Sequence, residues 1–192
     1  MGSYPTIWFL RHGETYWNAE RRVQGQLESE LTPRGIEQAH AQARLMQPIL
    51  ETVPPCFVSP LGRARQTARI ALGGADFTTD ARLAEVHAGD WQGELRDDIL
   101  RRNPDREGQT PLEVFLSAPN GERYDAFRNR IQSFLDELTR PSVVVGHGLL
   151  GQVLRGLLCG LDRAEMGALP NKQGCVFVLS DGVETVLRNE PD

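Results

Sequence analysis

The chain has 192 residues, of which 40% are hydrophobic and 24% charged, and its formal net charge is −5 at pH 7. These values allow one globular domain over residues 1–192 with a sizeable core. The negative charge argues against nucleic acid or an anionic membrane surface as a partner, because both attract basic surfaces. A positively charged pocket would have to be built locally.

Short apolar runs alternate with helical patterns along the chain, which predicts an α/β sandwich. The first strand is expected over residues 6–11, and a polar stretch follows it. Thr32 as N-cap and Pro33 in the first turn predict the next helix. Its inner face is expected to carry Ile36, Ala39, Ala43, Met46 and Leu50.

A second strand is expected over residues 56–59, and Pro60 opens a helix behind it. That helix should turn four small residues inward: Ala64, Thr67, Ala68 and Ala71. Residues 82–120 are less regular and predict an insertion over one end of the sheet, with a capping box from Thr110 to Glu113. A helix over 123–139, a third strand over 142–145, another apolar helix and a hairpin of 175–179 with 183–187 complete the pattern.

The three cysteines, Cys56, Cys159 and Cys175, lie in apolar stretches and have no close partner in the sequence. Their odd number predicts buried free thiols. No apolar run approaches the ~20 residues that span a bilayer, and the chain does not open with a secretion-signal pattern. We therefore expect a cytoplasmic protein.

Each of the three apolar strands ends in polar groups: Arg11-His12, Ser59 leading to Arg63, and His147. Ligands of open α/β sheets bind at the carboxyl ends of the parallel strands, so we expect these groups to meet. Phosphoryl transfer needs positive charge and donors around the phosphate oxygens, and imidazole can serve as the nucleophile. Two arginines and two histidines can therefore form a complete site without a metal or cofactor.

A carboxylic acid beside the leaving oxygen would help to break a phosphoester by protonating it. Glu85 fits this role, since a carboxyl group that is buried near a phosphate tends to keep its proton. From the residues alone, Asp90 and Glu94 are equally possible acids. The remaining histidines, His40 and His87, have no partner at a spacing typical of zinc ligands.

The run from Gly146 to Gly151 matches the G-x-G-x-x-G pattern of dinucleotide-binding sites and follows a predicted strand. Only about 40 residues follow it, which is too few for a complete dinucleotide domain. A tight turn explains these glycines better. It would bring His147 and backbone N–H groups, beginning with that of Gly148, close to an anion.

Four blocks of the sequence resemble the histidine phosphatase superfamily, also called the phosphoglycerate mutase-like fold. They are LRHGETYWN, SPLGRARQTA, LAEVHAGDWQG and VVVGHG, and they span Leu10 to Gly148. The resemblance implies a three-layer sandwich with a mostly parallel sheet between helices, and an insertion at approximately 90–122 that caps the pocket. It also implies the site residues: His12 as the phosphorylated nucleophile, Arg11, Arg63 and His147 as the phosphate clamp, Glu85 as the proton donor, and Asn18, Gln24 and Gly25 on the phosphate or substrate side.

Departures from the family's pattern concern the substrate. The run from Glu85 to Ala88 lacks the Arg and Tyr with which mutases of the family hold a substrate carboxylate, and the GDWQG block resembles the broad phosphatases. Glu28 stands where Asp is usual, and Leu149 where Gly is common. We therefore expect a phosphomonoesterase acting on a phosphorylated small molecule, of unknown oligomeric state. A phosphoglycerate mutase and a catalytically silent phospho-ligand-binding module are the alternatives.

Overall fold

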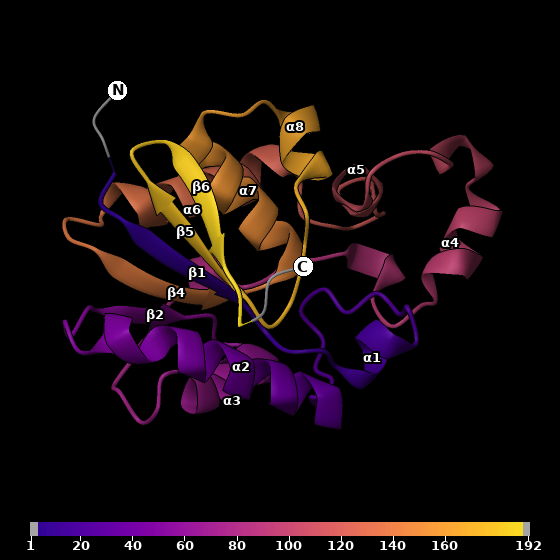
Figure 1. Cartoon of the computed structure of the whole chain (residues 1–192). Helices are drawn as coiled ribbons and strands as arrows, with labels where there is room; N and C mark the ends of the chain where they lie inside the picture. The colour runs from indigo at the N-terminus through magenta and orange to yellow at the C-terminus, as the bar shows by residue number, and fades with distance from the viewer. Residues whose placement is uncertain (1–3, 190–192) are drawn as a thin grey trace.

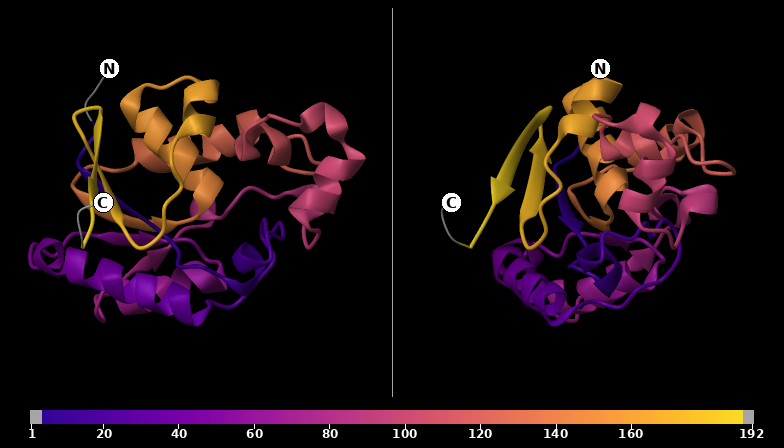
Figure 2. Two further views of the ribbon diagram at one scale, coloured as in Figure 1. Left: turned by 45° about the vertical axis from the view of Figure 1, so that its right-hand side comes forward. Right: turned by 90° about the vertical axis from the view of Figure 1, so that its right-hand side faces the viewer.

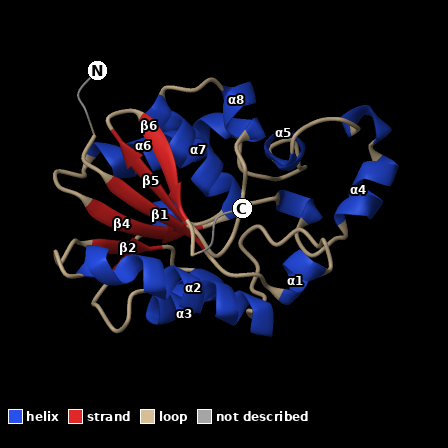
Figure 3. Cartoon of the chain, in the orientation of Figure 1, coloured by secondary structure: helices blue, strands red, loops and turns tan. Residues whose placement is uncertain are grey.

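The computed structural model describes residues 4–189 and has a six-stranded sheet between two layers of helices (Figures 1 and 3). The strands, in the order β3-β2-β4-β1-β5-β6, are β1 Ile7–Arg11, β2 Cys56–Val58, β3 Thr78–Thr79, β4 Ser142–Gly146, β5 Val176–Ser180 and β6 Val183–Leu187. The first four pair in parallel, and β5 runs antiparallel to both of its neighbours. The predicted three-layer α/β fold is confirmed.

The central strands are buried on both faces, which is why they appear in the sequence as continuous apolar runs. Successive side chains of a strand point to opposite faces. In β4, Val144 packs in the cluster that contains α6 (Tyr124–Asp136) and α7 (Gly148–Cys159). Val143 and Val145 pack instead with α2 (Pro33–Leu50) and α3 (Gly62–Ala71), on the lower side of the sheet in Figure 1.

Helix α2 begins as predicted, with Thr32 as N-cap and Pro33 as its first residue. The predicted inner face was partly wrong, because the buried residues are Gly35, Ala39, Gln42 and Met46, while Ile36 is exposed. Two contacts set this rotation. Gly35 lies directly against the loop after β1, and the Gln42 side chain donates hydrogen bonds of 3.0 Å to the carbonyls of Arg11 and Cys175.

Helix α3 buries all four residues predicted to face inward, Ala64, Thr67, Ala68 and Ala71. The predicted capping box is also present at the start of α5 (Pro111–Phe115). The antiparallel pairing of β5 with β6 confirms the predicted hairpin. Outside the segment between residues 81 and 122, three short elements escaped the sequence analysis: strand β3, α1 (Tyr16–Ala19) and α8 (Arg163–Ala168).

Residues 90–122 form a group of short helices that projects beyond the carboxyl ends of the strands, and we call this segment the cap (Figure 2). It contains α4 (Arg96–Arg102), the 3-10 turn Pro104–Arg106 and α5. The turn Ala81–Leu83 precedes it and the turn Gly89–Trp91 leads into it. Its own small core, Trp91, Ile99, Val114 and Ala118 with Val23 and Ala88, holds it against the loop after α1.

All three cysteines are free thiols. Cys56 and Cys175 are buried as predicted, but Cys159 is partly exposed because it ends α7 beside the left-handed Gly160. Between residues 4 and 189, no helix has the length and apolar character needed to cross a membrane.

Candidate active site

A cavity of about 310 Å³ lies at the carboxyl ends of β1 and β4, beneath the cap. Eight of the residues that the sequence analysis assigned to the site line it: Arg11, His12, Asn18, Gln24, Gly25, Arg63, Glu85 and Gly148. The ninth, His147, is fully buried behind the cavity wall. Neither His40 nor His87 reaches the lining.

His12 follows β1 directly, and its backbone N–H donates to the Gly146 carbonyl at 3.0 Å, which continues the pairing with β4. Ring atom Nδ1 lies 2.7 Å from the Gly13 carbonyl oxygen. A carbonyl can only accept, so Nδ1 carries the hydrogen and Nε2 keeps its lone pair. Burial, with the charges of Arg63 and Arg11, holds the pKa of His12 well below 6.5. The ring is therefore a neutral nucleophile.

The loop after His12 is fixed by close backbone packing. The Gly13 N–H donates to Thr67 Oγ1 at 3.1 Å, and a Cβ added at Gly13 would lie 2.2 Å from the Gly35 carbonyl oxygen. No side chain fits at position 13. Close contact with α2 thus explains why glycine follows His12 in the sequence. The same contact fixes the position of the His12 ring.

His147 ends β4 and is the N-cap of α7. Its ring centroid lies 5.2 Å from that of His12, and its Nε2 lies 2.6 Å from Ser59 Oγ. Burial, with the charges of Arg63 and His12, holds the pKa of His147 well below 6.5. Its Nδ1 is buried without a hydrogen-bond partner. This nitrogen therefore lacks the partner that a buried polar atom normally has.

The two clamp arginines are held by backbone carbonyls. Arg63 donates to Leu27 O at 2.8 Å and Gly25 O at 2.7 Å, and Arg11 donates to Asn171 O. In both, Nε is buried and has no partner. Burial lowers the pKa of each guanidinium, but arginine stays charged under all physiological conditions. A bound phosphate would pair both free N–H groups.

Glu85 is the only one of the three candidate acids that lines the cavity. Its carboxylate accepts from the backbone N–H groups of Val86 (3.0 Å), Leu149 (3.0 Å) and Leu150 (2.9 Å). The last two belong to the first turn of α7, whose partial positive charge attracts an anion. Its rivals are engaged elsewhere, Asp90 with Asn120 and Glu94 with Arg102.

An ion pair that the sequence analysis missed holds the segment that carries Glu85. Arg130 Nε and Glu122 Oε1 are 2.7 Å apart, and both side chains are mostly buried. Arg130 also donates to the carbonyls of Arg82 and Glu85, while Glu122 accepts from the His87 N–H at 3.3 Å. Neither residue lies in any of the four family blocks of the sequence, and no local pattern marks the contact between them.

Asn18, Gln24 and Gly25 line the cavity from α1 and the loop that follows it. Asn18 Oδ1 accepts from the Thr15 N–H in the capping box of α1, and Gln24 donates to Thr15 Oγ1 at 2.7 Å. Gln24 Oε1 is buried without a partner. Gly25 has a left-handed backbone (φ +54°) and offers its carbonyl to Arg63.

The two single-residue departures from the family pattern, Glu28 and Leu149, each make a defined contact in the structure. Glu28 Oε1 accepts from the Gly62 N–H at 2.8 Å and so caps α3 one residue before Arg63. Leu149 is nearly buried and contributes an apolar side chain to the cavity wall. Within residues 4–189, no group of three or more His, Cys, Asp or Glu side chains is arranged to hold a metal ion.

A family model and a named relative both match most of this chain. A model of the histidine phosphatase superfamily (branch 1) matches residues 7–186. A relative from Yersinia pestis (strain Pestoides F), described as probable phosphoglycerate mutase GpmB, is 34% identical over 163 residues, which are 81% of this chain and 75% of the relative.

Solved structures cover nearly the whole chain. The structure of a putative alpha-ribazole-5'-P phosphatase from Escherichia coli K-12 is 26% identical, with a TM-score of 0.76 over 97% of this chain and 96% of that one. Bacillus stearothermophilus YhfR is 28% identical, with a TM-score of 0.80 over 96% of each chain. The fold around the cavity is therefore shared with these proteins.

Proposed function

This chain belongs to branch 1 of the histidine phosphatase superfamily, and on that premise we propose that it is a phosphomonoesterase that acts through a phosphohistidine on His12. One observation carries the proposal. A neutral imidazole with a free Nε2 shares one cavity with Glu85 and with the unpartnered guanidinium N–H groups of Arg11 and Arg63.

In the first step, we propose that Arg11, Arg63 and His147 Nδ1–H bind the oxygens of the substrate phosphate. His12 Nε2 attacks the phosphorus in line with the ester oxygen, forming the N–P bond as the O–P bond breaks. Glu85, in its protonated form, gives its proton to the leaving oxygen, and the alcohol departs. The fixed positive charges stabilise the charge that spreads over the transferring group.

In the second step, the carboxylate of Glu85 takes a proton from water as the water oxygen attacks the phosphorus. The N–P bond breaks, inorganic phosphate leaves, and both the lone pair of His12 and the proton of Glu85 are restored. The guanidinium groups supply the positive charge, so this scheme uses no metal or cofactor.

We propose a small phosphorylated molecule as the substrate. A cavity of about 310 Å³ is at the lower end of the roughly 300–1,000 Å³ typical of small-molecule pockets. Such a volume suits a metabolite better than a phosphorylated protein segment.

Replacing the nucleophile tests the proposal. We expect His12→Ala to lower phosphate release from 4-nitrophenyl phosphate by about 10³-fold or more, because no other side chain forms the covalent intermediate. Circular dichroism should show an unchanged fold. Near-wild-type turnover in the variant would refute the assignment. A wild-type protein that releases no phosphate over roughly pH 5 to 8 would favour the silent binding module.

The likeness to probable phosphoglycerate mutase GpmB favours a mutase as the second candidate. A mutase would return the phosphoryl group of His12 to a different hydroxyl instead of to water. Incubation with 3-phosphoglycerate and its bisphosphate separates the two. Isomer formed without release of phosphate would favour the mutase, and release of phosphate without isomer would favour the phosphatase.

A further inference from the structure

The cavity carries more positive charge than a single phosphate needs. Five arginines line it, against one carboxylate, that of Glu85, in a protein whose net charge is −5. Arg11 and Arg63 belong to the proposed phosphate site. The other three, Arg21, Arg22 and Arg96, come from the loop after α1 and from the cap.

Backbone pairing gathers these three arginines at the cap side of the cavity. Arg22 forms an antiparallel bridge with Leu95, and the Arg96 N–H donates to the Arg21 carbonyl at 3.0 Å. Arg21 has a left-handed backbone (φ 58°), a conformation that is strained for a residue with a side chain. Strain of this kind gathers at ligand-binding positions.

Two of the three are already neutralised within the protein. Arg21 pairs with Asp97 at 3.0 Å. Arg22 pairs with Glu20 at 2.9 Å, donates to the Gly93 carbonyl and lies over the ring of Trp17. Their charges are therefore largely compensated before a ligand enters.

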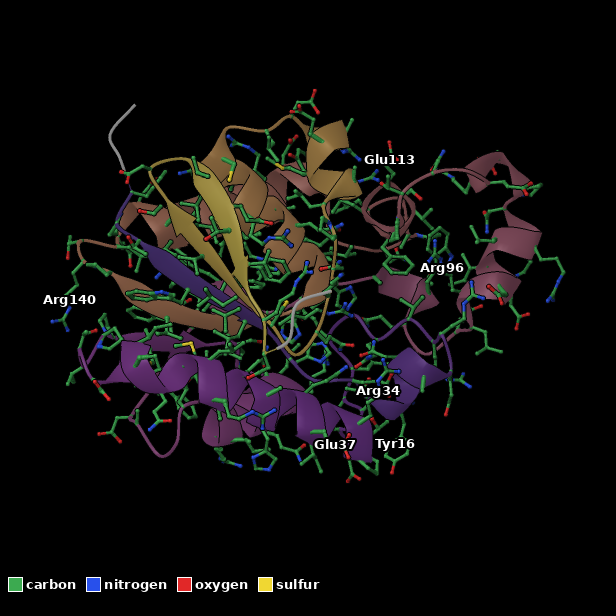
Figure 4. The ribbon with its side chains drawn as sticks, in the orientation of Figure 1. Tyr16, Arg34, Glu37, Arg96, Glu113 and Arg140 are labelled. Atoms are coloured by element: carbon green, nitrogen blue, oxygen red, sulfur yellow. The ribbon has the colours of Figure 1, made fainter. Side chains whose placement is uncertain are left out.

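Arg96 differs from them. Among the residues that the structure describes, its side chain forms no hydrogen bond or ion pair, and its Nε is buried without a partner. Arg96 is the first residue of α4, and Figure 4 labels it in the region of the cap. Phe115 and Pro111 of α5 line the same cavity and offer apolar contact to a carbon skeleton.

We propose that Arg96 binds a second anionic group of the substrate, so that the preferred substrates are small phosphomonoesters that also carry a carboxylate or a second phosphate. The planar guanidinium fork matches the paired oxygens of either group. This inference rests on the proposed function, because it takes the substrate phosphate to lie at Arg11, His12 and Arg63.

Binding of non-hydrolysable phosphonates tests the inference independently of turnover. The ligands are phenylphosphonate, its 2-, 3- and 4-carboxy derivatives, and 1,3-phenylenediphosphonate, titrated calorimetrically into the wild type and Arg96→Gln. We expect the wild type to bind at least one ligand with the second acid about 10-fold or more tightly than phenylphosphonate. The carboxylate and diphosphonate arms distinguish the two kinds of second group.

In Arg96→Gln this preference should disappear, while the affinity for phenylphosphonate stays within about 2-fold of wild type. Arg96→Lys keeps the charge without the fork and should retain part of the preference. Arg101→Gln is the matched control, because Arg101 lies on the same helix, is 74% exposed and does not line the cavity. It should behave as the wild type does.

Three results would overturn the inference: a wild type that gains nothing from any second acid, an Arg96→Gln variant that keeps the preference, or one that loses affinity for all ligands alike. Phosphate release from phenyl phosphate tests the proposed function separately. Turnover without a preference for the second acid would contradict the role of Arg96 alone. A preference without turnover would contradict hydrolysis alone.

Discussion

At the residue scale, the reactivity of His12 depends on its surroundings. Burial and the charges of Arg63 and Arg11 disfavour the protonated ring, so its pKa lies well below 6.5. A lowered pKa means that the ring gains its proton only as the pH falls well below 6.5, and Nε2 remains a nucleophile through weakly acidic conditions.

We predict that NMR titration of the His12 ring in the free protein gives a midpoint well below 6.5. Arg63→Met removes one of the charges that oppose protonation, so the midpoint in this variant should move upward. A wild-type midpoint at or above 6.5, or no upward movement in the variant, would contradict the electrostatic account.

The strand-end pattern in the sequence pointed to Arg11, His12, Arg63 and His147, because each of these lies at, or within a few residues of, the end of a strand that the apolar runs reveal. Arg130 and Glu122 act through contacts between segments that are far apart in the chain. No local pattern marks such contacts. Glu85 was separated from Asp90 and Glu94 in the sequence only by the family resemblance, whereas the cavity lining separates them directly.

At the scale of elements, the position of α2 against the loop after His12 is set by two glycines. A Cβ added at Gly35 would lie 2.0 Å from the Glu14 carbonyl oxygen, and one added at Gly13 would lie 2.2 Å from the Gly35 carbonyl oxygen. These neighbours are backbone atoms and cannot rotate away. A side chain at either position would therefore displace the helix or the loop that carries the nucleophile.

We predict that Gly35→Ala lowers the free energy of unfolding by about 1–3 kcal/mol, the usual cost of overpacking, and also lowers turnover by displacing His12. Chemical denaturation and steady-state kinetics would measure the two effects. Gly62→Ala is the matched control in the first turn of another helix, since its nearest neighbour is the flexible Glu28 side chain at 3.0 Å. A Gly35→Ala variant as stable as Gly62→Ala would contradict this account.

The elements differed in how well the sequence predicted them, and the difference depends on whether local rules determine them. The N-cap of α2 and the inner face of α3 follow from local rules and were correct. The face of α2 was misplaced because its rotation depends on the glycine contact and on buried Gln42. β3, α1 and α8 contain two, four and six residues, which is too short for a periodic pattern to show.

At the scale of the whole molecule, a buried arginine connects the sheet to the site. Arg155 of α7 is 0% exposed and donates to both carboxylate oxygens of Glu184, at 2.7 and 2.8 Å, while its guanidinium lies 3.8 Å from the ring centroid of Phe177. It also donates to the Pro170 carbonyl. The next residue, Asn171, accepts the hydrogen bond of Arg11.

We predict that Arg155→Met lowers the free energy of unfolding by about 3–5 kcal/mol, because it leaves the carboxylate of Glu184 unpaired and mostly buried. The double variant Arg155→Met, Glu184→Gln should recover part of this loss. Urea denaturation of the wild type, both single variants and the double variant measures the coupling. Strictly additive losses would show that the pair does not act as a unit.

The alternation of apolar strands with helices predicted the layers of the molecule, because burial on both faces leaves a continuous apolar run. The conformation of the cap was not predictable in the same way. Its helices are short, and its small core includes Val23 and Ala88 from outside the segment. Arg96 gains its place in the cavity only through that packing.

The most direct test of the account is to trap the covalent intermediate. The protein would be mixed with substrate, quenched in alkali within one turnover, and analysed by mass spectrometry and ³¹P NMR. Because the Gly13 carbonyl holds the hydrogen on Nδ1, we predict phosphate on Nε2 of His12, formed and consumed as fast as product appears. Steady turnover with no phosphate on His12, or with phosphate on another residue, would contradict the account.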